Sequence, residues 1–363
     1  MSRRGALDVE VVTADRACEW DGYVNQAPAH DAFHHRDYVA AVARGEPLLL
    51  VVRRSAALWM LPVEVYQSHL GAVDVIDARS AYGYSGPIWT RDWPDDEHES
   101  AWQHAFDVLS ECRVVTLLLR LHPTLPHPPV WPRGAVARHE GDVVVMPLDI
   151  GDDAYWGTMR RGHRKNLRRA LREELVAQVE TMPSSISDFY SVYAATMDRL
   201  DARDAYRFGT DTFTQIIQSP ELSARLVTVR DPTRLLAAGI FLAHGPCGHY
   251  YLSGSESQHA YGSRPTRLMV HHARGLLASE GCSALNLGGG LGAQRDALFA
   301  FKSEFSETTR PYYTVRCVLD GERYGALCHA AGMKESPALD DGWFPAYLAP
   351  APTPGAVRGG ERR

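Results

Sequence analysis

The sequence predicts an α/β fold built from two copies of one unit, in which mixed sheets are flanked by helices. Each half contains an apolar strand, a tight charged turn and a second apolar strand, at 46–66 and at 224–245. A helix and a further strand follow in both halves. Because the first copy is less complete, we expect a degenerate domain at 1–150, a second domain at 151–333, and an extension at 334–363 with a Pro/Gly-rich, disordered end.

The remaining elements follow from hydrophobic periodicity and turn residues. In the first half we expect a helix at 97–111 and strands at 114–121 and 142–150. In the second half we expect helices at 153–174, 186–200, 210–218 and 265–279, and strands at 247–255, 284–289 and 312–320.

Composition indicates a soluble globular protein. The chain has 363 residues, 45% hydrophobic and 23% charged, with a net charge of −6. No overall field therefore draws it to nucleic acid or to an anionic membrane, so any anionic partner must be held by a local patch. No stretch of 18 apolar residues predicts a membrane span, and the start of the chain lacks the apolar core of a signal peptide. We expect a cytoplasmic protein, and the sequence does not indicate its oligomeric state.

Cysteine and histidine patterns do not predict a metal or a disulfide. The six cysteines are scattered without a CxxC pair, which favours free thiols in a reducing compartment. The 16 histidines include no HExxH motif. We therefore expect neither a structural metal nor a bound cofactor.

The segment 156–174 is strongly basic. If it is one helix, like charges stack at successive i+4 steps on two neighbouring stripes. One stripe carries Arg160, Arg164, Arg168 and Arg172, and the other carries Arg161, Lys165 and Arg169. Five such pairs would cost about 1–2.5 kcal/mol, with Glu173 as the only relief within the helix. Two interpretations stay open: a solvated helix paired with acids elsewhere, or a platform for a phosphorylated partner.

A second anion site is suggested before the helix at 265–279. Acyl-CoA-dependent acetyltransferases hold a pyrophosphate on a [QR]-x-x-G-x-[GA] loop, and Gln258 and Gly262 match it only in part. Pro265 is a favourable first helical residue, and a helix N-terminus attracts anions. Arg264 and Arg267 would assist. The alternative is an ordinary helix start.

The stretch LNLGGGLGAQRDALFAFKSEFS, at 285–306, carries the sharpest functional prediction. An apolar strand ends on Gly288–Gly290, and a short helix follows. Leu298, Phe301 and Phe305 are expected to face the core, with Lys302 at the edge of that stripe and no acid at helical spacing. Lys302 is either solvated or placed to stabilise charge that develops on a carbonyl oxygen. If it were desolvated, it could also serve as a base.

At this point the residues resemble a known family. The pattern LNLGGG…D-x-L-x-x-FK-x-x-F is similar to the C-terminal signature of Fem-type aminoacyl-tRNA-dependent transferases, relatives within the GNAT acetyltransferase superfamily. The segments WGTMRRGHRKNLRRA, DFYSVYAATMDRL with YRFGTDTF, and HYYLSGS resemble further family motifs, and AFHHRDYV and YGYSGPIW resemble weaker ones. The resemblance covers most of residues 30–320.

The resemblance implies tandem GNAT domains and transfer of an amino acid from aminoacyl-tRNA to an amine. The acceptor would be a peptidoglycan precursor or an amine-bearing natural product, such as an antibiotic. It assigns transition-state stabilisation to Lys302, with Phe301 beside it, and Asp296 is a possible base. Substrate-binding positions would be Arg36, Tyr84, Tyr206, Arg207, Tyr251, Gly288, Gly289 and Gly290. Contacts to tRNA would come from Arg160, Arg161, Arg164, Lys165, Arg168, Arg169, Arg264 and Arg267.

Two alternatives remain open from the sequence. One is an acyl-CoA-dependent GNAT N-acyltransferase that acts on a metabolite or a polysaccharide precursor. The other is a tRNA- or anion-binding module without activity. The sequence does not reveal which amino acid, tRNA or amine is used.

Overall fold

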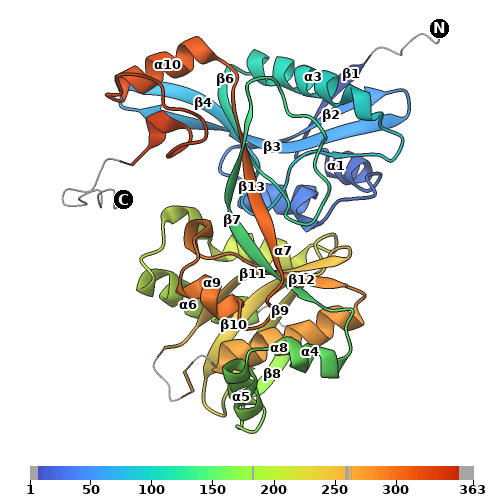
Figure 1. Cartoon of the computed structure of the whole chain (residues 1–363), viewed down its shortest axis with the longest axis vertical. Coiled ribbons are helices and arrows are strands. Elements are labelled where there is room, and N and C mark those ends of the chain that lie inside the picture. Colours follow the sequence, from blue (N-terminus) through green and yellow to red (C-terminus); the bar gives the residue numbers. More distant parts are fainter. Residues whose placement is uncertain (1–6, 182–183, 258–260, 263, 351–363) are drawn as a thin grey trace, which may run out of the picture.

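The computed structural model describes residues 7–181, 184–257, 261–262 and 264–350. Within these residues the strands form one 13-stranded sheet, in the order β1-β2-β3-β4-β6-β13-β7-β12-β11-β10-β9-β8, with β5 beside β3. Two lobes are visible, and β7 and β13 run between them (Figure 1).

The helices and strands have the following bounds. The first half contains β1 (Asp8–Thr13), α1 (Ala17–Val24), α2 (Arg36–Val42), β2 (Glu46–Arg54), β3 (Ala57–Leu70), β4 (Val73–Arg79), β5 (Ile88–Trp89), α3 (His98–Glu111), β6 (Val114–Arg120) and β7 (Val136–Pro147). The second half contains α4 (Asp152–Thr158), α5 (Arg161–Ala170), β8 (Val176–Glu180), α6 (Ser184–Arg199), α7 (Thr210–Gln218), β9 (Ala224–Arg230), β10 (Leu235–Leu242), β11 (Cys247–Ser255), α8 (Arg264–Ser279), β12 (Ala284–Gly288), α9 (Ala297–Lys302), β13 (Thr309–Val318) and α10 (Gly321–Ala330).

The predicted duplication is confirmed by the topology. In the first half, β1 to β4 pair antiparallel in order, α3 crosses over, and β6 returns parallel to β4. In the second half, β8 to β11 pair in the same way, α8 crosses over, and β12 returns parallel to β11. A parallel return needs a long crossover, and the helix supplies it in both copies.

Two long strands exchange between the copies. β7 ends beside β12, whereas β13 pairs with β7 at its start and with β6 at its end. The segment that follows β13 therefore returns to the first half, where Tyr324, Phe344 and Tyr347 pack on Val75 and Val115. Residue 150 lies between the two crossover units, and β13, the last strand, pairs with both β6 and β7. Residues 351–363, where a disordered end was expected, lie outside the described residues.

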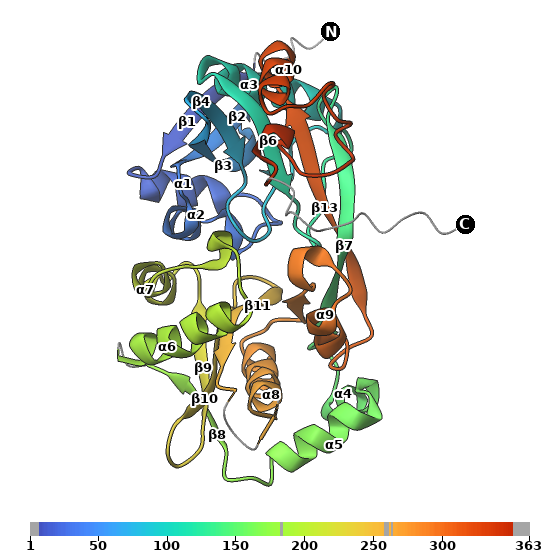
Figure 2. The same cartoon turned by 90° about the vertical axis from the view of Figure 1, so that its left-hand side faces the viewer.

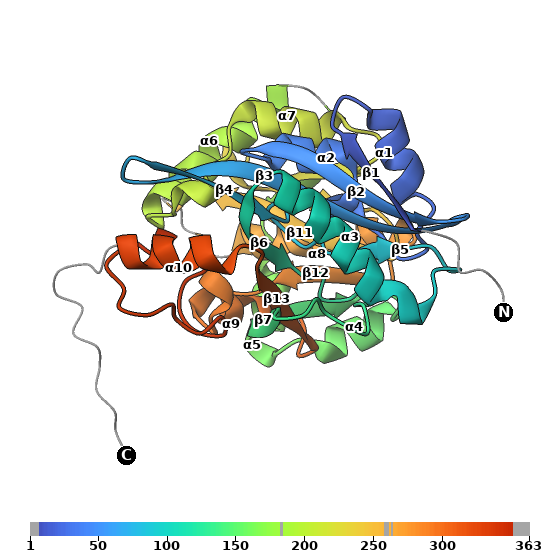
Figure 3. The same cartoon turned by 90° about the horizontal axis from the view of Figure 1, so that it is seen from above.

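Strand β10 shows why the sequences of strands in the second half are apolar without interruption. Ala238, Ile240 and Leu242 face the core beneath α6 and α7, while Ala237 and Phe241 face the core beneath α8. Both faces are covered by helices (Figure 2), so alternate residues are all buried. The first half is likewise covered on both faces, with α1 and α2 on the opposite side of its sheet from α3 (Figure 3).

One hydrophobic core is shared by the two halves. Phe33 and Tyr38, from the first half, belong to the same buried cluster as Phe189 and Phe213 of α6 and α7. The hydroxyl of Thr212 also donates to the carbonyl of Ala41 across this contact, at 3.1 Å. The halves are therefore held together by a packed interface and by the two exchanged strands.

The predicted helix at 153–174 is wrong as a single element. Met159 and Arg160 adopt extended backbone, with ψ of 145° at both, and divide it into α4 and α5. The break places Met159 in the core beneath α8, a gain that outweighs two lost helical residues. The elements β1, α1, α2, β4, β5, β8 and α10 were not predicted from the sequence. Among the described residues, none of the helices combines the length and the apolar character that crossing a membrane requires.

Candidate active site at the glycine corner

The triple-glycine segment is a corner that only glycine can form. Gly288 has φ of +77°, in the left-handed region that side chains disfavour. A Cβ at Gly289 would lie 2.9 Å from the carbonyl oxygen of Asp142, and a Cβ at Gly290 would lie 2.1 Å from that of Gln294. The end of β12 is therefore bare backbone packed against its neighbours.

Of the two alternatives left open for Lys302, the structure has the side chain directed to this corner and not into solvent. It is the last residue of α9, and its Nζ donates to the carbonyl oxygen of Gly289 at 2.7 Å. Burial lowers the pKa of Lys302 to about 8, although the nearby Asp296 carboxylate favours the charged form. An ammonium with this pKa remains mostly protonated at neutral pH and can still exchange its proton.

Tyr84 approaches the same point from the first half. A Cβ on Gly288 would lie 3.2 Å from the Nζ of Lys302 and 3.5 Å from the hydroxyl of Tyr84. Burial raises the pKa of Tyr84, so its hydroxyl stays protonated and can donate. The structure thus brings together three of the predicted site residues, from two distant parts of the chain.

Asp296 acts as a helix cap. Its carboxylate accepts from the backbone N–H of Phe299 and of Leu291, both at 2.9 Å. Burial would raise the pKa of Asp296, but these hydrogen bonds lower it below its ordinary value. Such a carboxylate is a poor proton acceptor and therefore a poor general base. In the structure it caps the start of α9 and places a negative charge near Lys302.

The expected apolar stripe of α9 is wrong in one respect. Leu298 is exposed, whereas Phe299 is buried and packs in the core beneath α8. Phe305 is buried as expected, but it lies beyond the end of the helix. The helix is only six residues long, so the 3.6-residue period predicts its buried face poorly. Phe301 is half-buried and lies under the guanidinium of Arg267.

A network of buried polar side chains, which was not predicted from the sequence, holds the backbone of the corner. Asn286 accepts from the N–H of Gly288 at 2.8 Å and faces Nδ1 of His249 at 3.4 Å. His249 in turn donates to the carboxylate of Asp31 at 2.8 Å, and Nε2 of His122 lies 2.5 Å from the same oxygen. His249 begins the segment HYYLSGS, and Asp31 lies immediately before the segment AFHHRDYV, but neither residue was predicted as a site residue.

Asp31 is the ionised centre of this network. Burial would raise its pKa, but the charge and hydrogen bond of His122, with hydrogen bonds from His249 and His34, hold the pKa well below its ordinary value. Burial lowers the pKa of His122, against the attraction of Asp31. The network spans both halves of the chain, so it fixes the corner relative to the first half.

Strands β11 and β12 diverge next to the corner. They pair at only three positions, the last being His249 with Asn286. Past this point, β11 continues through Tyr251 while β12 ends at Gly288. Parallel strands that separate expose unpaired backbone groups between them, and such groups can bind an extended ligand.

The other predicted substrate-binding residues lie in different surroundings. Tyr251 packs edge-on against Tyr38, with ring centroids 5.6 Å apart, and burial raises its pKa. Tyr206 contacts Tyr82 in the same aromatic wall, at 5.8 Å. Arg207 instead pairs with Asp198 at 2.5 Å.

Arg36, another of the predicted substrate-binding residues, is held by two neighbours. Its guanidinium donates to the carbonyl of Ala14 at 2.6 Å and pairs with Asp37 at 3.0 Å. Both partners lie within the first half.

The predicted tRNA-binding residues divide into exposed and engaged groups. The exposed members are Arg160, Arg161, Lys165, Arg168 and Arg169. Arg164 is half-buried and donates to the carbonyl of Trp156 at 3.2 Å. Arg264 pairs with Glu173 at 2.8 Å, and Glu173 also relieves Arg169 as expected. Arg267 is buried and does not share the exposed face.

Arg267 joins the basic helix to the Lys302 segment. It pairs with Glu304 and donates to Nδ1 of His163, while His163 packs on Phe305 with ring centroids 4.2 Å apart. Burial lowers the pKa of His163 to about 4, with the nearby Arg267 charge acting in the same direction. The exposed face of α5 therefore belongs to a helix packed directly against the segment that follows Lys302.

Two of the hollows in the described part of the chain are not lined by Lys302. One, of about 770 Å³, lies beside α8 and is lined by residues that include Leu148, Ile150, His271 and Arg274. Gln258, the predicted start of a pyrophosphate loop, lies outside the described residues, and Gly262 has φ of +58°.

Known proteins resemble this chain in part of its sequence and in its fold. Residues 157–302 match the family model described as acetyltransferase (GNAT) domain. The structure is similar to that of FemX, with a TM-score of 0.62 and 12% identity over 87% of this chain and 98% of the other. It is also similar to L-PGS from Bacillus licheniformis, with a TM-score of 0.54 and 11% identity over 82% and 90%. No curated protein sequence matches. The predicted tandem α/β fold is confirmed as GNAT-like, and residues 157–302 are the part of the chain that matches the acetyltransferase (GNAT) domain.

Proposed function

We propose that this protein transfers an amino acid from aminoacyl-tRNA to the amine of a peptidoglycan precursor or of an amine-bearing natural product. The observation that carries the proposal is the Lys302 ammonium, held inward at a corner of bare backbone and faced by Tyr84. The resemblance of the signature around Lys302 to Fem-type transferases, and the likeness of the fold to FemX, support this donor over others.

The reaction needs orientation and charge stabilisation more than a strong base. The acceptor amine attacks the ester carbonyl of the aminoacyl group, which produces an oxyanion and then releases the terminal ribose hydroxyl. Lys302 would donate to the oxyanion, and the Tyr84 hydroxyl would donate from the other side. The amine loses a proton and the ribose oxygen gains one. A lysine with a pKa of about 8 can pass that proton between them.

The exposed face of α5 would hold the tRNA backbone. Its arginines and Lys165 present cationic groups to solvent, and α5 is packed against the Lys302 segment. Contacts to phosphates release counterions, so binding through this face must weaken steeply as salt rises.

A second candidate is acyl-CoA-dependent N-acylation of a metabolite or of a polysaccharide precursor. The matching family model is described by acetyl transfer, and the divergence of β11 from β12 beside α8 suits an extended acyl donor. Lys302 would have the same role, since an oxyanion forms with a thioester as well.

The test is a transfer assay with a pool of charged tRNAs, acyl-CoAs and candidate amines, with products identified by mass. Ribonuclease should abolish product formation and omission of CoA should not, and K302A should lose at least a hundredfold in rate with its folding intact. If product still forms in the presence of ribonuclease but requires acyl-CoA, the second candidate is the function. K302A at the wild-type rate would refute both.

The tRNA contact is tested by charge reversal. R161E/R169E should bind tRNA at least tenfold more weakly and with a shallower salt dependence, whereas R91E/R133E, a matched pair of exposed arginines in the first half, should bind as the wild type does. Equal losses in both pairs would show that only net charge matters.

A further inference from the structure

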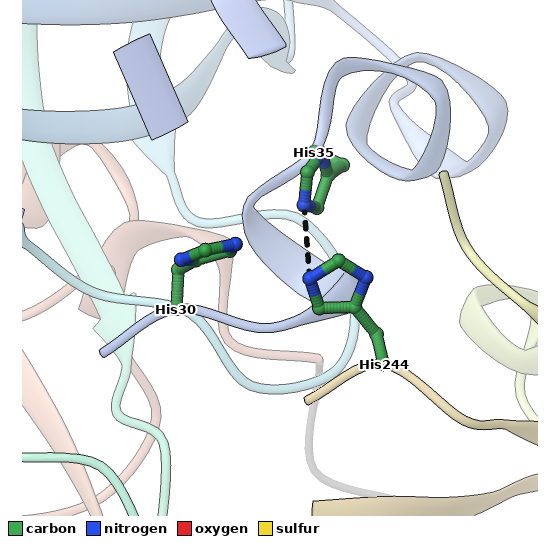
Figure 4. Close-up of side chains that lie close together, drawn as sticks. All are labelled: His30, His35 and His244. Carbon is green, nitrogen blue, oxygen red and sulfur yellow. Dashed lines mark hydrogen bonds between the residues drawn. The ribbon is translucent and has the colours of Figure 1, made fainter. Parts of the chain in front are cut away.

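Three histidines from both halves of the chain meet at the interface between them. His30 and His35 precede α2, and His244 lies in the turn between β10 and β11. Ring centroids are 5.4, 5.1 and 4.6 Å apart, and one nitrogen of each ring lies within 4.8 Å of the others. The close-up shows the rings gathered around one point (Figure 4).

The hydrogen bonds of these rings fix their tautomers. In each ring Nδ1 faces an oxygen that can only accept, so Nδ1 carries the hydrogen and Nε2 of the neutral ring presents a lone pair. The acceptors are the carbonyl of Ala27 at 2.6 Å for His30, the carboxylate of Asp21 at 2.9 Å for His35, and the carbonyl of Glu221 at 2.9 Å for His244.

The consequence is an unfavourable contact unless a cation is present. Nε2 of His35 lies 3.3 Å from Nε2 of His244, and neither ring has a hydrogen to place between them while both are neutral. His35 is fully buried, while His30 and His244 are half-buried, so one side of the cluster reaches solvent.

A neighbouring cluster shows the contrast. Nδ1 of His122 accepts from the backbone N–H of Thr124 at 3.2 Å and of Leu125 at 3.1 Å, so its Nε2 carries the hydrogen and donates to Asp31. His249 also donates to Asp31. Ordinary hydrogen bonds therefore account for the group of Asp31, His122 and His249, and we assign no ion to it.

We propose that Nε2 of His30, His35 and His244 binds a divalent transition-metal ion, zinc in the first instance, that clamps the two halves together. Zinc–imidazole bonds are about 2.0–2.1 Å, so two ligands at a tetrahedral angle lie about 3.3–3.4 Å apart, as His35 and His244 do. An oxygen acceptor on the second nitrogen of each ligand is the usual outer shell of such sites. The half-exposed side leaves the fourth position to water.

The clamp has a structural consequence that does not rest on the transfer reaction. His30 is followed directly by Asp31, whose network reaches Gly288 through His249 and Asn286. The ion would hold residues 30–35 against the β10–β11 turn and so fix the position of Asp31 relative to the second half.

The test uses the full chain without a histidine tag, stripped with a chelator and then titrated with Zn²⁺ and with Co²⁺. After dialysis, we expect elemental mass spectrometry to measure one metal ion per chain. The Co²⁺ form should show the absorption band of a tetrahedral site, and zinc should raise the unfolding temperature. H30Q and H244Q should bind at least tenfold more weakly. H69Q is the matched control, because His69 is exposed and pairs with Asp74, and it should bind as the wild type does.

Three results would overturn the proposal. They are no stoichiometric ion on the wild type, a Co²⁺ spectrum without the tetrahedral band, and undiminished binding in H244Q. The wild-type measurements decide the question even if a variant fails to fold. Loss of transfer activity in K302A leaves the metal measurement untouched, so the two proposals fail separately.

Discussion

Replacing Lys302 by methionine should make the protein more stable and inactive at the same time. The folded state holds the Lys302 ammonium in a half-buried position, where burial lowers its pKa from 10.5 to about 8. Such a shift corresponds to about 3 kcal/mol of destabilisation of the charged form relative to the unfolded chain. Methionine has a similar length and carries no charge that must be desolvated.

The net effect is smaller than the full cost. K302M also loses the hydrogen bond to Gly289, and a bond from a charged donor contributes about 1.5–3 kcal/mol. We therefore expect the free energy of unfolding at pH 7 to rise by about 1 kcal/mol. This gain should accompany at least a hundredfold loss of transfer rate.

The pH dependence provides a second signature. Between pH 8 and 10.5 the unfolded wild type binds more protons than the folded one, so wild-type stability rises with pH across this window. The advantage of K302M should be complete below about pH 8 and should disappear as the pH rises toward 10.5. Urea unfolding of both proteins from pH 7 to 10 measures it. The reasoning would be refuted if K302M were less stable than the wild type at pH 7, or if the difference in unfolding free energy between the two proteins did not change with pH.

Three further predictions concern the corner and its support. G288A should lose at least tenfold in rate and about 1 kcal/mol in unfolding free energy, because φ at Gly288 is +77° and the new Cβ would lie 3.2 Å from the Lys302 ammonium. G162A, on the open face of α5, is the control and should gain about 0.5–1 kcal/mol in unfolding free energy. Equal unfolding curves for the two variants would contradict both predictions. D31N should lower the unfolding free energy in urea by about 3 kcal/mol, because Asp31 accepts from two buried histidines, and an unchanged midpoint would show that the network contributes nothing. The transfer rate should decline as the pH rises through about 8, where Lys302 loses its proton. In an active K302R variant this decline should move to higher pH, because arginine keeps its proton. If the pH–rate profile of kcat/KM for K302R still declines near pH 8, the decline belongs to another group.

Local patterns predicted the corner well because its chemistry lies in one stretch of chain. Three consecutive glycines after an apolar strand indicate a special backbone, and a lysine without an acid at helical spacing left open a role at that corner. The duplication was predictable for the same reason, since each copy repeats a strand pair joined by a charged turn.

Contacts between distant segments were not predictable from such patterns. The basic stretch breaks at Met159 because the core beneath α8 accepts that side chain, which periodicity alone does not reveal. Asp31 meets His249 only when the two halves pack. The histidine cluster is of the same kind: HDAFHH at 30–35 is dense in ligands, but the third ligand lies more than two hundred residues away, so no spacing motif indicates it.

The path of β13 has a consequence for biogenesis. β6 remains an open edge until residues 314–318 have left the ribosome and paired with it, and these residues lie some two hundred positions further along the chain. A fragment that ends near residue 150 would expose that unpaired edge and β7 to other chains. The polypeptide should therefore acquire its native state only after β13 has been synthesised, and its halves should denature together in a single transition.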